Sequence, residues 1–278
     1  MQVLAYYADT YEEAARTQVV ATGERDGAPW VAVEHCLFHP QGGGQPADRG
    51  WVAGHEITPV RDHGSGLVVA VASGDEAPPA RPALPAFPAL SALSALSVGQ
   101  PVDVRIDLPL RTAHAALHTA GHLIEAAGRA QGWSLAANIH FPGQARIEFT
   151  APCPDPRLDT PEGREEATGA LRTEIARAVA ENLPVTWEYD AEKRRVVRLG
   201  ELHAAPCGGT HVRSLGDLAE VVLPTLKVKK GRIRVSYSAT HTPRTPRTTH
   251  APHAPHTTHA PHTVYATRTG QASPQARP

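Results

Sequence analysis

Residues 117–128 read LHTAGHLIEAAG and carry two histidines, His118 and His122, four positions apart. In a helix that spacing places both imidazoles on one face, one turn apart. We expect one helix from about Arg111 to Gln131, with Gly132 as its C-terminal stop. Two ring nitrogens on such a helix could share one ion.

This histidine pair has other interpretations. The metalloprotease motif has the same spacing but needs a glutamate directly after the first histidine, and Thr119 stands there. That class is excluded. Histidines four apart in a helix also occur as ordinary surface or core residues, so the pair alone does not establish a metal site.

A second stretch, APCGGTHV at residues 205–212, places Cys207 and His211 on either side of two glycines and a threonine. Glycine tolerates positive φ, so we expect a tight turn that aims the thiolate and the imidazole at one point. Three histidines and one cysteine suit tetrahedral zinc better than magnesium or calcium. The alternative is a buried cysteine that packs like a small apolar residue, with a capping histidine.

A third stretch, GGGQ at residues 42–45, lies between expected strands. Three glycines let the backbone approach a ligand closely, and Gln45 supplies a donor and an acceptor. A flexible hairpin loop would have the same composition.

The order of segments predicts an α+β chain. Residues 1–73 alternate in short segments, including VLAYYADTY and PWVAVEHCLF, and predict a small antiparallel β domain. Residues 74–99 are rich in Pro and Ala and predict a surface insertion or linker without chemistry. Residues 100–238 begin with a strand at Pro101 and predict an α+β domain with helices on one face of an antiparallel sheet.

Within the second domain, AANIHF and QARIEFT predict a hairpin, and a second helix should open at Thr160 and run to about Asn182. Later segments, among them LAEVVLPTLKVKK and RIRVSYS, predict further strands, the last ending near Ser238. Residues 239–278 hold six of the sixteen histidines among Thr, Pro, Ala and Arg, and predict a disordered tail.

The bulk composition excludes several protein classes. A chain of 278 residues with 41% hydrophobic and 20% charged residues predicts a soluble protein of two packed domains. No apolar run is long enough for a membrane span, and the acidic N-terminus does not resemble a secretory signal, so we expect the cytoplasm. Three cysteines predict reduced thiols and no disulfide framework.

The net charge of -1 does not indicate a nucleic-acid binder. RNA contacts would have to come from a local basic patch. Two patches are candidates: Arg194, Arg195 and Arg198, and then Lys227, Lys229, Lys230, Arg232 and Arg234. A solvated strand edge is the alternative for both.

GGGQ, HTAGH at 118–122 and CGGTHV at 207–212, in this order, resemble the editing domain of alanyl-tRNA synthetase and its freestanding relatives of the AlaX type. The second domain also resembles the editing domain shared with threonyl-tRNA synthetase. The resemblance covers residues 1 to about 238, without the insertion and the tail. It implies an N-terminal β-barrel-like domain and a freestanding editor that is not itself a synthetase.

The resemblance implies a trans-editing hydrolase that uses zinc to cleave the ester of mischarged tRNA(Ala), with serine as the first substrate and glycine as the second. The expected zinc ligands are His118, His122, Cys207 and His211. Cys207 would also lie close to the scissile ester, and Gln45 would orient water or the amino acid.

Other residues are assigned to support this reaction. We expect Gly42, Gly43, Gly44, Thr119 and Thr210 in the substrate site, with the two threonines as partners for metal-bound imidazoles. Glu125 is either a general base or a solvated helix residue. The acceptor end of tRNA(Ala) would approach along the 227–234 segment of a monomer.

Three residues depart from the family pattern Thr-x-Phe-Tyr-Pro-Glu before the glycines: Cys36, His39 and Gln41. They leave open the choice between serine and glycine. Cys36 and His39 are a poor second metal site, because side chains at that spacing point in different directions. A catalytically inert, zinc-stabilised tRNA-binding module and a general metallohydrolase for small esters are the competing hypotheses.

Overall fold

The computed structural model describes residues 1–73 and 92–242. Residues 74–91 of the Pro- and Ala-rich insertion and the histidine-rich tail from residue 243 lie outside the described residues. Leu93, in the described end of the expected surface insertion, is 1% exposed and packs in the apolar core of the barrel, so the expectation is wrong there. Of the helices that the structure describes, none combines the length and apolar composition that a membrane span requires.

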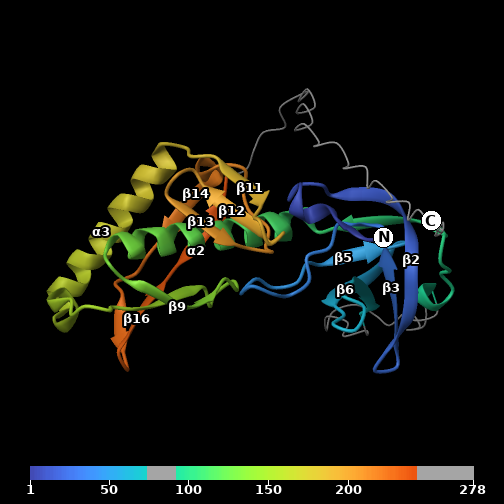
Figure 1. Cartoon of the computed structure of the whole chain (residues 1–278), viewed down its shortest axis with the longest axis horizontal. Helices are drawn as coiled ribbons and strands as arrows, with labels where there is room; N and C mark the ends of the chain where they lie inside the picture. The colour runs from blue at the N-terminus through green and yellow to red at the C-terminus, as the bar shows by residue number, and fades with distance from the viewer. Residues whose placement is uncertain (74–91, 243–278) are drawn as a thin grey trace, which may run out of the picture. The chain divides into compact units, whose positions relative to one another are not determined.

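The N-terminal part is a closed barrel, as the resemblance implied. Its strands follow the order β2-β3-β7-β6-β5-β8 around the barrel, and Figure 1 shows its first strands in blue. The strands are β2 (Ala14–Arg25), β3 (Ala28–Val33), β5 (Gly50–Val52), β6 (His55–Arg61), β7 (Val68–Ala72) and β8 (Pro101–Ile106). Closure leaves no free sheet edge, which removes a route to aggregation.

Two expectations for this region were wrong. The strand β8, assigned above to the second domain, closes the barrel between β2 and β5, because its alternate residues Val102, Val104 and Ile106 face the barrel core. The segment VLAYYADTY is not one strand: β1 (Val3–Leu4), which pairs with β4 (His35–Cys36), is followed by the 3-10 helix η1 (Ala5–Tyr7). Tyr6 is buried there, which a short helical turn permits.

Helix α2 (Leu108–Ala130) carries the histidine pair and starts three residues earlier than the sequence analysis expected. The Asp107 carboxylate accepts a hydrogen bond from the Leu110 N–H at 3.1 Å and so caps the first turn. Pro109 fits in that turn because the first helical N–H groups need no intrahelical partner. At the other end, Gly132 has φ +83°, which confirms the predicted stop.

Helix α3 (Pro161–Ala180) begins where the sequence predicted, since the Thr160 hydroxyl accepts from the Gly163 N–H at 3.1 Å. It packs against α2. Around these helices lies one apolar core that includes Ile124, Phe149 and Leu171. Figure 1 shows α2 in green with strands on both sides of it.

The strands of this part form three separate sheets, where the sequence analysis expected one. The orders are β15-β16-β10-β9, β11-β12-β13 and β14-β17. Their members are β9 (Ser134–Ile139), β10 (Arg146–Thr150), β11 (Val185–Tyr189), β12 (Arg195–Leu199), β13 (His203–Pro206), β14 (Leu218–Val222), β15 (Lys227–Lys229), β16 (Arg232–Ser236) and β17 (Ser238–His241). The short 3-10 helices η2 (Pro156–Asp159) and η3 (Leu215–Asp217) connect elements.

Two boundaries explain this difference. The segment LAEVVLPTLKVKK divides between β14 and β15, which belong to different sheets, because Pro224 lacks the N–H that a continuous ladder needs. The last strand, expected to end near Ser238, begins there and runs to His241, pairing with β14. Both differences concern how strands pair over long range, which alternation along the chain does not encode.

Candidate metal centre

Four side chains from two distant segments meet at one point. The ligating atoms of His118, His122, Cys207 and His211 all lie within 4.8 Å of one another. The Cys207 Sγ lies 3.5 Å from the His118 Nε2 and 3.2 Å from the His211 Nε2. The three histidines are buried and Cys207 is partly buried, so Cys207 is the least buried residue of the four.

His118 is held by a side chain of the N-terminal part. The Gln45 Oε1 accepts from the Thr210 N–H at 3.0 Å, which identifies that atom as the amide oxygen. The same oxygen lies 2.7 Å from the His118 Nδ1, so this nitrogen must carry the proton and donate. The His118 Nε2 is therefore a lone-pair nitrogen that faces Cys207.

His211 is held by the helix. Its Nδ1 lies 3.1 Å from the Thr119 hydroxyl, which also accepts from the Val212 N–H at 3.1 Å. Thr210 contributes differently, because its hydroxyl accepts from the Gln45 Nε2 at 2.9 Å. Thr119 thus contacts an imidazole of the cluster directly, whereas Thr210 reaches His118 only through Gln45.

His122 is held by a residue that the sequence analysis did not single out. Its Nδ1 lies 2.9 Å from the Nε2 of His203, the first residue of β13. Behind it, the Glu125 carboxylate approaches the same nitrogen at 3.8 Å and accepts from Arg129 at 2.6 Å. Glu125 is 4% exposed and is therefore not a solvated helix residue.

The turn that carries Cys207 is fixed by close approach. A Cβ on Gly209 would lie 2.1 Å from the His118 Cε1, so only glycine fits there. The expected positive φ is absent from both Gly208 and Gly209. The turn is clamped by the Arg195 guanidinium, which donates to the Cys207 carbonyl at 2.9 Å and to the Gly209 carbonyl at 3.0 Å.

Burial sets the protonation of the cluster. It lowers the pKa of His118 and His211 well below the usual value and that of His122 to about 3, with the neighbouring histidines adding to the effect. The imidazoles are therefore neutral near pH 7, the form that binds metals. Burial also raises the pKa of the Cys207 thiol. A bound cation would displace the thiol proton and bind the thiolate. This donor set fits one metal ion.

A buried ion pair joins the barrel loop to helix α2. Arg111 binds the Asp48 carboxylate through two nitrogens, one of them at 2.7 Å, and both side chains are almost fully buried. Arg111 also donates to the Leu37 carbonyl at 2.5 Å. Asp48 follows Gln45 by three residues, so this pair fixes the loop that anchors His118.

Sequence comparison with known proteins finds relatives among alanyl-tRNA editing proteins and alanine–tRNA ligases. The alanyl-tRNA editing protein AlaX-M of Pyrococcus horikoshii is 25% identical over 222 residues, which cover 78% of this chain and 87% of the relative. The alanine–tRNA ligase of Methanothrix thermoacetophila is 31% identical over 75% of this chain, and the alanyl-tRNA editing protein Aarsd1 of Rattus norvegicus is 26% identical, also over 75%. The chain is a homologue of the alanyl-tRNA editing proteins.

These relatives differ in length. The matched region covers 23% of the Methanothrix ligase and 48% of rat Aarsd1, so the chain spans only part of these proteins. No family model matches the chain.

The three departures from the editing-protein pattern lie in different surroundings. Cys36 is fully buried, and burial raises the pKa of its thiol to about 12. His39 is buried, with its Nδ1–H donating to the Pro46 carbonyl at 3.3 Å, and burial lowers its pKa to about 4. Gln41 is exposed, and it lines a cavity together with His39. Of the three departures, only His39 and Gln41 line that cavity and can contact a ligand in it.

The two basic segments named as candidates for RNA binding differ in how much free positive charge they expose. Arg195 is buried in the clamp on the cysteine turn, whereas Arg194 pairs with Asp190 at 2.8 Å and Arg198 with Glu188 at 2.7 Å. The first patch therefore offers little free positive charge. In the second, Lys227 and Lys229 are exposed on β15, and Arg234 pairs with Glu148 at 2.8 Å.

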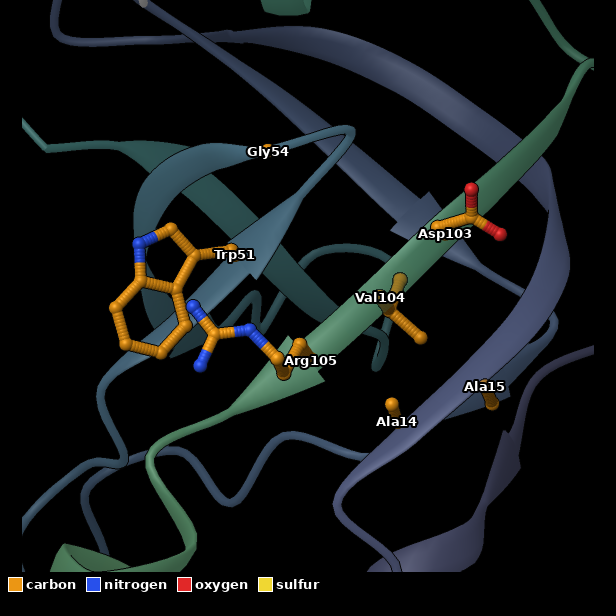
Figure 2. Close-up of a pocket in the computed structure, with 7 residues that line it drawn as sticks. All are labelled: Ala14, Ala15, Trp51, Gly54, Asp103, Val104 and Arg105. Atoms are coloured by element: carbon orange, nitrogen blue, oxygen red, sulfur yellow. The ribbon is translucent and has the colours of Figure 1, made fainter.

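A different cavity lies on the outer wall of the barrel. Figure 2 shows Trp51 of β5 beside Arg105 of β8, whose guanidinium carbon lies 3.8 Å from the ring centroid. The cavity measures about 420 Å³, and its lining includes Ala14 and Asp103. None of the seven residues that line it belongs to the cluster of His118, so we do not assign the reaction to it.

Proposed function

We propose that this chain is a trans-editing deacylase that hydrolyses the ester of mischarged tRNA(Ala), with Ser-tRNA(Ala) as the first substrate and Gly-tRNA(Ala) as the second. The observation that carries the proposal is the convergence of three neutral imidazoles and one thiol on one point, with Cys207 as the least buried residue of the four. Homology to proteins named for alanyl-tRNA editing supports the substrate class.

In this proposal His118, His122, Cys207 and His211 hold a zinc ion, because neutral imidazole and thiolate are the ligands that zinc prefers. A zinc ion in such a site polarises an ester oxygen or acidifies water. The protein's own contribution is orientation: Gln45 fixes His118, Thr119 fixes His211 and His203 fixes His122.

Gln45 acts as a positioning residue in this proposal. Its oxygen accepts from both Thr210 N–H and His118, its amide nitrogen donates to Thr210, and the side chain is fully buried. These partners leave its oxygen no room for water or the amino acid. The partly buried Cys207 and the glycines of the GGGQ loop are the groups that would face the substrate.

Deacylation of purified Ser-tRNA(Ala) tests the proposal. We expect the wild-type chain to release serine and the Cys207→Ala variant to retain no more than the uncatalysed rate. Correctly charged Ala-tRNA(Ala) should be spared, since a pocket that pairs the serine hydroxyl discriminates by orders of magnitude. Equal rates for wild type, variant and buffer would overturn the assignment and favour an inert tRNA-binding module.

The use of tRNA itself separates the deacylase from a general esterase. A general metallohydrolase would cleave serine esters of simple alcohols as fast as the tRNA ester, with little dependence on salt. We expect a large preference for the tRNA ester that weakens as the salt concentration rises.

A further inference from the structure

A cavity of about 580 Å³ opens between the barrel and the turn that carries Cys207. Its lining comes from η1, the segment around the GGGQ loop, strand β6 and Gly208, together with Arg25 and His63. Gly208 directly follows Cys207, and a Cβ on it would lie 3.1 Å from the Tyr7 hydroxyl. Ligand pockets typically measure roughly 300–1,000 Å³, so this cavity has room for a nucleotide.

The charge of this cavity favours an anionic ligand. Arg25 and Arg61 line it, and its described lining contains no carboxylate. Arg61 donates only to neutral oxygens, the Tyr6 hydroxyl and the Gly66 carbonyl, each at 3.3 Å. The neighbouring Asp62 carboxylate instead accepts from the backbone and hydroxyl of Ser65. The Arg61 guanidinium is thus positioned and without an acidic partner among these contacts.

Two further features match a nucleotide. Tyr7 is a partly exposed aromatic ring that lines the cavity with its hydroxyl close to Gly208, and unpaired bases bind to such rings by stacking. Gly42 lines the cavity with no positive φ, and nothing lies within 4 Å of the position of a Cβ there. The fold does not require glycine at Gly42, whereas an occupied cavity would.

The other basic surface does not adjoin the metal cluster. Lys227 and Lys229 lie on β15, at the edge of the sheet β15-β16-β10-β9, and the cavity that they line includes no residue of the metal cluster or of the GGGQ loop. That surface can contact a distant part of an RNA. The end that carries the ester has to reach Cys207.

We propose that the cavity beside Gly208 seats the 3′-terminal nucleotide of the acylated RNA, with Arg61 pairing its 5′ phosphate and Tyr7 contacting its base. This rests on the deacylase function proposed above. It explains why a barrel accompanies the metal centre: one wall of the seat is the barrel strand β6. The acyl group then projects past Gly208 towards Cys207.

Binding of 5′-AMP and of adenosine, followed by NMR titration of the metal-loaded full chain, tests the phosphate contact without turnover. We expect AMP to bind at least about 10-fold more tightly than adenosine, as for a hydrogen bond to a charged group. Arg61→Gln should remove this preference and Arg61→Lys should retain part of it. Arg105→Gln, which removes an equally charged barrel arginine outside the cavity, should leave it unchanged.

A side chain that fills the cavity gives a second test. Gly42→Leu should keep the wild-type melting temperature and lose binding of both AMP and adenosine. Unchanged AMP preference in Arg61→Gln, or equal loss in Arg105→Gln, would overturn the proposal. Failure of the proposed function is separate: it would appear as wild-type inactivity on Ser-tRNA(Ala) while AMP binding still depends on Arg61.

Discussion

His118 and His122 lie one turn apart on α2, yet different parts of the molecule hold them. His118 donates to the amide oxygen of Gln45, which comes from the loop beside the barrel. His122 instead meets His203, on β13 of the C-terminal part, with Glu125 behind it. An amide does not titrate near neutral pH, whereas a second imidazole can. The comparison teaches that the barrel region is a structural part of the candidate metal centre.

The largest effect should come from breaking the link between the barrel loop and the helix. Asp48→Asn leaves the Arg111 charge buried without its partner, and such losses cost about 3–5 kcal/mol in unfolding free energy. Urea denaturation measures this. The double variant Asp48→Leu with Arg111→Met should recover much of the loss, because it leaves no lone charge. A stable Asp48→Asn protein would show that this link is dispensable.

Removing the anchor of His118 should lower activity next. Gln45→Leu leaves the His118 Nδ1–H and the Thr210 N–H buried without acceptors. We expect deacylation of Ser-tRNA(Ala) to fall by about 100-fold, at the upper end for a partner of a metal ligand. Gln45→Glu keeps an acceptor oxygen and serves as the matched control. Equal rates in Gln45→Leu and wild type would remove the barrel from the account of the site.

The anchor of His122 should matter less. His203→Ala should weaken metal affinity by about 10-fold, because His122 keeps its place on the helix and only its ring orientation is released. Competition with a chromophoric chelator measures this affinity. An effect larger than that of Gln45→Leu in the same assay would reverse the comparison.

The metal-free chain should also lose stability as the pH falls. Burial holds the pKa of His39 at about 4 and that of His122 at about 3, whereas both titrate near 6.5 in the unfolded chain. The unfolded state therefore binds more protons below pH 6.5, and each histidine lowers the unfolding free energy by about 1.4 kcal/mol per pH unit as the pH falls towards 4. Urea midpoints at pH 7, 5.5 and 4.5 measure the slope, which His39→Gln should reduce. A flat profile would contradict burial of these imidazoles.

The sequence predicted the local elements and the four side chains that lie together as candidate ligands, because both depend on motifs within short segments. Thr160 as a cap, Gly132 as a stop and the paired histidines of α2 depend on residues within a few positions of one another. The place of β8 in the barrel and the division of the strands into three sheets depend on pairing between distant segments, which spacing does not encode.

The residues missed at the site follow the same rule. His203 stands in ELHAAP, whose one polar ring carries no motif, and its role arises only because β13 places it against His122. Arg195 reads as a basic surface residue beside Arg194, and only the fold turns it inward onto the carbonyls of Cys207 and Gly209. The one signal that could have marked Arg195 is its position two residues before Val197 and four before Leu199, on the same buried face of the strand.

The most direct test of the central claim is X-ray absorption spectroscopy at the zinc edge of the full chain loaded with one equivalent of zinc. The account predicts one sulfur at about 2.3 Å and three nitrogens at about 2.0 Å, with the sulfur lost in Cys207→Ala. The histidine-rich tail contains no cysteine, so zinc held there would have no sulfur neighbour. A spectrum with only nitrogen and oxygen neighbours would contradict the four-residue metal centre.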